Sequence, residues 1–156
     1  MRVLGIDFGA RRVGLALSDP SGRLARPWRA VARRDGDDAA LAADLAREIA
    51  TLAADEDGLA AVVVGRPARL DGSPTEMTVR VEAFAAALGA LVRVPVALAD
   101  ERLSSHEAEA RLAERERDWR KRKAKLDAAA AAVILQDYLD RSPAPAAPLP
   151  AGGDLA

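Results

Sequence analysis

The sequence predicts an α/β domain built on a mixed sheet. Apolar runs of strand length alternate with segments of helical periodicity along most of the chain. The first two runs are close enough in sequence to form a hairpin, whereas the later ones are separated by helices, as in parallel crossovers. At 156 residues the chain has the usual length of one domain. We therefore expect a five-stranded mixed sheet flanked by helices.

The first half of the chain should contain four of the strands and one helix. Residues 2–8 and 12–18 predict the hairpin, and a third strand is expected between Leu24 and Arg33. From Asp37 to about Ala54, apolar residues recur at helical spacing with charges between them. Leu59 to Gly65 is a continuous apolar run, which is typical of a strand buried on both faces.

The second half should contain the remaining strand between helices. Ser73-Pro74-Thr75-Glu76 has capping-box spacing and a proline at the first helical position, so it predicts a helix to about Leu91. Val92 to Ala99 is the fifth predicted strand, and a second capping-box spacing starts at Ser104. The last helix should run from about Leu126 to Leu139. Residues 141–156 are rich in proline and alanine and predict a disordered tail, which leaves residues 1–140 as the domain.

Composition excludes several kinds of site. The chain has 0 cysteines, so it can form neither a disulfide nor a thiolate metal site, and we expect a soluble, cytoplasmic protein. Its net charge of -1 means that contact with nucleic acid would need a local basic patch. One short run holds seven positive residues against Glu116 and Asp118, and it is either solvated surface or a phosphate-binding segment. The positive residues are Arg115, Arg117, Arg120, Lys121, Arg122, Lys123 and Lys125.

Three carboxylates follow or precede apolar segments where charge is costly to bury. Asp7 ends the first strand, although it could simply cap the following turn. Glu101 follows the fifth strand, although it could form a surface pair with Arg102 or Arg111. Asp127 could be a helix N-cap, but the helical period also puts it on the apolar face with positions 131, 134 and 138.

Acids from three separate elements would repel one another at one end of a sheet unless a cation held them. In open sheets, the carboxyl ends of the parallel strands form the usual ligand site. Hard oxygen donors of this kind favour Mg²⁺ or Mn²⁺, and a pair of such ions suits in-line hydrolysis of a phosphodiester by water. We therefore expect Asp7, Glu101 and Asp127 to form a catalytic metal site.

Four motifs in order give the chain a family resemblance up to Tyr138. They are Gly5-Ile6-Asp7-Phe8-Gly9 through Arg12-Val13-Gly14, Val64-Gly65-Arg66-Pro67 with Asp71-Gly72-Ser73, Asp100-Glu101-Arg102-Leu103-Ser104, and Lys125-Leu126-Asp127-Ala128-Ala129-Ala130. With these motifs the chain resembles the YqgF (RuvX) family of Holliday junction resolvase-like proteins, which are also described as nucleases for the precursor of small-subunit ribosomal RNA. The resemblance implies a ribonuclease H-like fold, a cytoplasmic location and metal-dependent nuclease chemistry at the same three acids. The chain departs from the family pattern at Ala10, Arg66 and Arg69.

The partner implied by these features is RNA, above all precursor ribosomal RNA, or branched DNA. Phosphate contacts add affinity without reading sequence, so arginine and lysine near the acids and in the basic run are the candidate contacts, with Trp119 to stack on bases. A single tryptophan at a strand edge usually packs, so Trp28 is given no role, and neither is His106. The candidate nucleic-acid contacts are Arg11, Arg12, Arg66, Arg69, Arg102, Trp119, Arg120, Lys121, Arg122, Lys123 and Lys125.

Two other functions remain open at this stage. Asp7, Gly9 and Gly14 on a hairpin also resemble the phosphate loop of ATP-binding proteins of the actin and sugar-kinase type, although the chain has residues for only one lobe. A nucleic-acid-binding or transcription-associated module with purely structural acids is the other alternative. The sequence does not decide whether the substrate is RNA or DNA, or whether cleavage is endonucleolytic or exonucleolytic. It also leaves open the oligomeric state, with a homodimer as one possibility.

Overall fold

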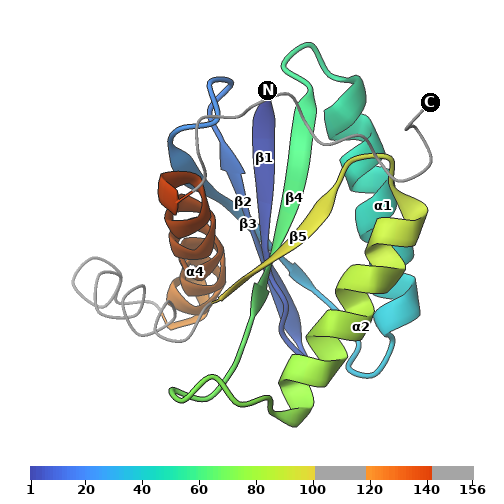
Figure 1. The fold of residues 1–156 in the computed structure, drawn as a ribbon, viewed down its shortest axis with the longest axis vertical. Coiled ribbons are helices and arrows are strands. Elements are labelled where there is room, and N and C mark those ends of the chain that lie inside the picture. The colour runs from blue at the N-terminus through green and yellow to red at the C-terminus, as the bar shows by residue number, and fades with distance from the viewer. Residues whose placement is uncertain (101–118, 142–156) are drawn as a thin grey trace.

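The computed structural model describes residues 1–100 and 119–141, with backbone only for residues 119–124. Its elements alternate as the apolar pattern predicts, and the described residues form one sheet with helices on both sides (Figure 1). In chain order they are β1 (Arg2–Asp7), β2 (Arg12–Ser18), β3 (Ala25–Ala32), α1 (Asp38–Ala54), β4 (Leu59–Arg66), α2 (Glu76–Leu91), β5 (Val96–Asp100) and α4 (Trp119–Arg141).

The sheet has five strands in the order β3-β2-β1-β4-β5. β2 pairs antiparallel with both β1 and β3, whereas β4 pairs parallel with both β1 and β5. The predicted mixed sheet, with a hairpin at one edge and crossovers at the other, is therefore confirmed.

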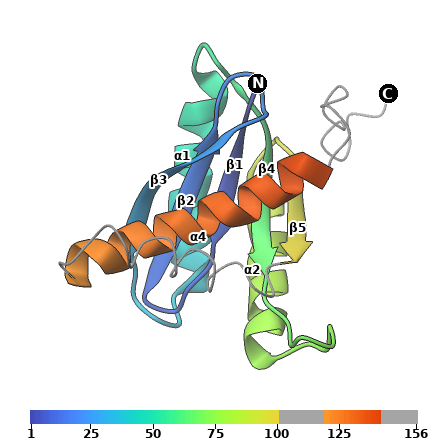
Figure 2. The same ribbon diagram turned by 90° about the vertical axis from the view of Figure 1, so that its left-hand side faces the viewer.

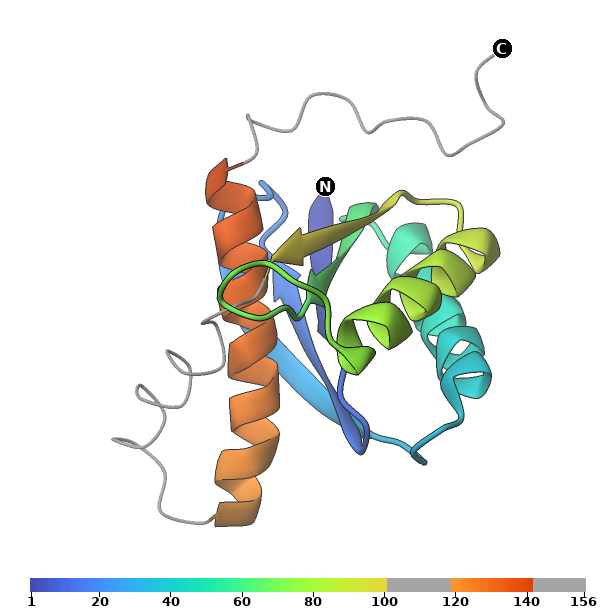
Figure 3. The same cartoon turned by 60° about the horizontal axis from the view of Figure 1, so that its bottom comes forward.

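The sheet separates two apolar layers. Figure 3 shows α1 and α2 on one side of the sheet and α4 on the other. Leu4, Ile6 and Phe8 of the first strand segment point into the larger core under α1 and α2, while Val3 belongs to the smaller core under α4. Because side chains alternate along a strand, this sorting fixes which face each residue of β1 uses.

The predicted starts of α2 and β5 are wrong, the first because of a local hydrogen bond and the second because of a missing donor. The N-cap of α2 is Thr75, not Ser73, and its capping box joins Thr75 to Thr78. The Ser73 hydroxyl instead bonds Asp71 within the preceding loop, at 2.6 Å. β5 begins at Val96 rather than Val92 because Val92 is the C-cap of α2 and Pro95 has no N–H to give to the sheet.

Helix α4 begins earlier than predicted, at Trp119 instead of Leu126. After Trp119 the added residues are arginines, lysines and alanine, which are strong helix formers, so the basic run continues the helix without a break. In Figure 2, α4 crosses the face of the sheet diagonally. The predicted helix opening at Ser104 lies outside the described residues. Of the predicted tail, residues 141–156, only Arg141 is described, and it is the last residue of α4.

Candidate active site

Asp7 lies at the carboxyl end of β1, on the face of the sheet that α4 covers. Alternation along β1 gives Asp7 the same direction as Val3, which packs in the core under α4, and Gly5, whose Cα lies against Leu135 of that helix. Asp7 is partly buried. A partly buried carboxylate at the end of a central strand is well placed for ligand chemistry.

Asp127 lies inside α4, and its side chain faces the sheet. It is roughly two turns beyond Trp119, so the alternative that it caps the helix is wrong. Ala131 and Ile134 of the same helical face are 0% and 1% exposed, which confirms the direction that the helical period predicts. The Asp127 carboxylate remains 26% exposed and can still be reached from solvent.

Gly14 brings these two acids together. In the β1–β2 ladder, Gly14 is the register partner of Asp7. A β-carbon built on Gly14 would lie 1.9 Å from the main-chain oxygen of Asp127, so only a glycine lets the helix come this close. Asp7 and Asp127, from two elements far apart in the chain, are therefore neighbours across one residue.

Arg12 bonds Asp127 directly. The Arg12 Nε donates to Asp127 Oδ2 at 2.7 Å, and the two side chains are 32% and 26% exposed. Among the described residues the bond uses only Nε, so the outer edge of the guanidinium, with its two Nη groups, stays available for two oxygens of an anion such as phosphate. Arg12 and Asp127 stand in separate motifs of the sequence, which does not predict that they form a pair.

Glu101, the third predicted acid, lies outside the described residues. The described chain stops at Asp100, whose register partner on β4 is Arg66. Within residues 1–100 and 119–141, no three histidine or acidic side chains are grouped closely enough to hold a metal ion. Asp7 and Asp127 supply hard oxygen donors that suit Mg²⁺ or Mn²⁺, and the donor set would need Glu101 to complete it.

The other predicted nucleic-acid contacts fall into two groups. Arg11 is exposed beside Arg12, and Arg66 is 3.9 Å from Glu82. Arg69 holds its own loop, since its Nη1 donates to the Pro74 carbonyl at 2.7 Å. Lys125 is exposed on α4. The rest, Arg102, Trp119, Arg120, Lys121, Arg122 and Lys123, together with His106, have side chains outside the described part of the structure.

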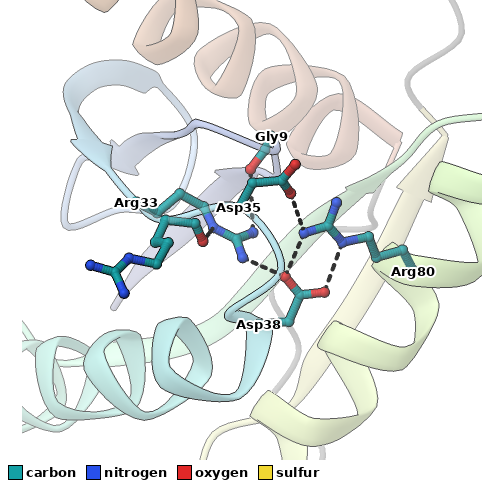
Figure 4. A network of polar contacts seen from close by, with 6 residues as sticks. Gly9, Arg33, Asp35, Asp38 and Arg80 are labelled. Atoms are coloured by element: carbon teal, nitrogen blue, oxygen red, sulfur yellow. Dashed lines mark hydrogen bonds and ion pairs between the residues drawn. The ribbon is translucent and has the colours of Figure 1, made fainter.

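A charged network that the sequence analysis missed supports the loop after Asp7 (Figure 4). Arg33 donates to the Gly9 carbonyl at 3.3 Å and also bonds Asp38. Arg80 of α2 donates to both oxygens of Asp38, at 2.8 and 2.9 Å, and to Asp35. Both guanidinium groups lie over the ring of Phe8. No local pattern could have revealed this network, because its members come from three separate segments.

The network also sets the ionisation of its acids. Hydrogen bonds from Arg80, and secondarily from Arg33, together lower the pKa of Asp38 to about 2 against the opposing effect of burial. The Arg80 hydrogen bond likewise lowers the pKa of Asp35. Since the Arg33 side chain is only 3% exposed, the negative charge of Asp38 is what makes burial of that cation tolerable.

Comparison with known proteins identifies the family. The RuvX family, described as Holliday junction resolvase, matches residues 1–141. A protein of Anaeromyxobacter sp. (strain Fw109-5), named as a candidate pre-16S rRNA nuclease, is 47% identical over 140 residues, which cover 90% of this chain and 97% of its own. A protein of Maridesulfovibrio salexigens with the same name is 42% identical over 142 residues, 91% of this chain and all of its own.

Solved structures resemble the chain more distantly. RuvC of Thermus thermophilus in complex with a Holliday junction substrate aligns with a TM-score of 0.47 and 16% identity, covering 86% of this chain and 91% of RuvC. A ROK hexokinase of Thermus thermophilus aligns with a TM-score of 0.46 and 20% identity, covering 70% of this chain and 38% of the hexokinase. On the family match and the close relatives, the chain belongs to the RuvX family.

Proposed function

We propose that the chain is a metal-dependent nuclease that cleaves phosphodiester bonds in a ribosomal RNA precursor. The observation that carries this proposal is the placement of Asp7 and Asp127 on either side of Gly14, at the carboxyl end of the central strand. Membership of the RuvX family and the names of the close relatives support nuclease chemistry.

Asp7, Glu101 and Asp127 would hold Mg²⁺ or Mn²⁺, with two ions suited to the three carboxylates. When bound, such ions neutralise charge that develops on the phosphate and lower the pKa of water. The carboxylates supply the ligands and fix their positions, Asp7 from the end of a rigid strand and Asp127 from the middle of a packed helix. A rigid scaffold of this kind keeps the reacting groups aligned.

Arg12 would have two roles, one toward Asp127 and one toward the substrate. Its Nε holds the Asp127 carboxylate in one orientation, and its free Nη edge would bind a phosphate oxygen of the substrate. Further phosphate contacts would come from Arg11, Arg66, Arg69 and Arg102 and from the basic start of α4, between Trp119 and Lys125. Trp119 would stack on bases.

The choice of RNA rests on the names of the relatives, which specify pre-16S ribosomal RNA. The family description points to branched DNA as the alternative substrate. Among the described residues, none identifies a contact to a 2′-hydroxyl group, which would distinguish RNA from DNA. The decisive experiment compares single-stranded RNA, duplex RNA, a precursor ribosomal RNA fragment, single-stranded DNA and a four-way DNA junction, each with Mg²⁺ or Mn²⁺.

We expect Asp7-dependent cleavage to be fastest on a substrate that contains RNA. Faster Asp7-dependent cleavage of the four-way junction would assign the chain to branched DNA instead. Binding without any Asp7-dependent cleavage would favour a non-catalytic nucleic-acid-binding module. Stabilisation by ATP in a thermal unfolding assay, without cleavage, would favour the nucleotide-binding alternative.

A further inference from the structure

We propose that the exposed edge strand β3 is a second nucleic-acid-binding surface, which guides single-stranded RNA or DNA toward Asp7. The sequence around this strand is unusually basic: residues 20–34 contain five arginines and no acidic residue, in a chain of net charge -1. Those arginines are Arg23, Arg26, Arg29, Arg33 and Arg34. The proposal rests on the proposed function for the identity of the ligand, but not for the surface itself.

Three of the five arginines are available for a ligand. Arg33 is buried against Asp38, and Arg29 pairs with Glu48 of α1. Arg23, Arg26 and Arg34 are exposed, and within the described part of the chain none of them forms an ion pair. Arginines without carboxylate partners leave a local positive potential that attracts phosphate.

Trp28 gives this strand a stacking group between the cations. Trp28 is 37% exposed, so part of the residue can be reached from solvent. The guanidinium carbon of Arg29 lies over the ring, 4.6 Å from its centroid, in a cation–π contact. The register shift opposite Leu15 and Ala16 leaves Trp28 as the extra residue of β3, between Pro27 and Arg29. Exposed aromatic rings beside arginine are the usual means of holding unpaired bases.

The direction of β3 connects this surface with the candidate active site. β3 starts beside Ser18 and ends beside Arg12, which bonds Asp127. Arg26 lies near the far end of the strand and Arg34 lies just past the near end, so they are separated by up to about 25 Å of extended chain. A strand of nucleic acid that follows β3 would therefore arrive at the carboxyl end of β1.

The same edge is poorly suited to pairing with another strand. Pro27 lacks an N–H donor, and the Ala25 N–H is already bonded to Gln136 of α4 at 2.9 Å. A second copy of the chain docking edge to edge would also bring like charges together. Single-stranded nucleic acid meets none of these obstacles, because it needs positive charge and an aromatic face rather than main-chain hydrogen bonds.

The test measures binding without metal, so that it does not depend on catalysis. The chain has two tryptophans, Trp28 and Trp119, and Trp119→Phe leaves Trp28 as the only indole reporter. In EDTA, titration with oligouridine or oligothymidine should quench Trp28 fluorescence. Trp28→Ala in the otherwise native chain should weaken binding about tenfold, while Trp28→Phe should retain most of the affinity.

The arginines are tested by the salt dependence of the same binding. Arg26→Gln and Arg34→Gln should each flatten the log-log slope by about 0.7. Arg47→Gln on α1, a surface arginine that is 74% exposed, is the matched control and should leave the slope unchanged. Circular dichroism confirms that each variant is folded.

Trp28 fluorescence that is not quenched, or equal salt slopes for Arg26→Gln and Arg47→Gln, would overturn the proposal. The arginines would then serve only to protect the sheet edge from pairing with another strand. Self-association of the native chain in sedimentation, abolished by Arg26→Gln, would overturn the proposal. It would identify β3 as a contact between copies of the chain instead. Quenching and slope changes in a chain that cleaves nothing would instead retain this surface and reject the proposed nuclease function.

Discussion

The main-chain oxygen of Asp127 lies where a side chain on Gly14 would begin, 1.9 Å from a β-carbon built at that position. Because Gly14 has no side chain, the helix that carries Asp127 can lie directly on β2, the strand that pairs with Asp7. Main-chain atoms cannot yield as a flexible side chain can. The spacing of the two acids therefore depends on the absence of a single carbon.

Gly14→Ala should accordingly damage both stability and activity. The added carbon must push α4 away from the sheet, so we expect a loss of about 3 kcal/mol in the free energy of unfolding and a marked fall in cleavage. Gly89→Ala in α2 is the control, because its β-carbon would lie 3.9 Å from Val96, at ordinary contact distance. That change should raise stability by up to about 1 kcal/mol. Urea unfolding of both variants measures the contrast, and equal effects would contradict this account of Gly14.

Arg12→Gln should reduce cleavage far more than stability. The Arg12–Asp127 pair is partly exposed, so its loss should cost at most about 1 kcal/mol of folding free energy. Cleavage should fall at least about tenfold, because Asp127 loses its orienting bond and the substrate loses a phosphate contact. Arg12→Lys should restore charge but only part of the rate, since lysine cannot reproduce the planar geometry of the guanidinium. Activity of Arg12→Gln equal to that of Arg47→Gln would remove Arg12 from the site.

Asp38→Asn should destabilise the chain by roughly 3 kcal/mol at neutral pH, because it leaves the buried Arg33 cation without its carboxylate. The pKa of Asp38 is lowered from 3.8 to about 2. The stabilisation is therefore complete above the ordinary pKa and is lost as the pH falls from about 4 toward about 2. The stability difference between wild type and variant, measured in urea at several pH values, should shrink over that window. A difference that stays constant down to about pH 2 would contradict the ion-pair explanation.

Neutralising Arg120, Lys121, Arg122 and Lys123 together should weaken nucleic-acid binding for all sequences. If each residue contacts one phosphate, the log-log salt slope should fall by roughly 0.7 to 0.9 per lost contact. A filter-binding assay over a range of salt concentrations measures this slope. An unchanged slope would identify the basic start of α4 as solvated surface.

Much of the fold could be predicted because local patterns determine it. The bounds of β2 agree with the predicted run 12–18, and α1 begins within one residue of the predicted Asp37. The direction of Asp127 followed from the helical period alone, because Ala131 and Ile134 mark the buried face.

The remaining features depend on contacts between distant segments, which periodicity does not report. Arg12 and Asp127 are 115 residues apart, and Arg80 and Asp38 are 42 apart. Glycine inside a strand is a general sign of close backbone approach, so Gly5 and Gly14 could have indicated that a helix packs there. The sequence alone did not say which helix.

The central claim, that Asp7 and Asp127 belong to one metal-dependent site, is tested most directly by Asp7→Asn. The change removes a charge but almost no volume, so we expect an unchanged unfolding midpoint without metal. Cleavage in Mg²⁺ or Mn²⁺ should fall at least about 100-fold, and thermal stabilisation by Mn²⁺ should be reduced together with it. Asp57→Asn, at an exposed acid in the turn before β4, is the control and should behave as wild type. Undiminished cleavage by Asp7→Asn, in a preparation free of contaminating nuclease, would contradict the account.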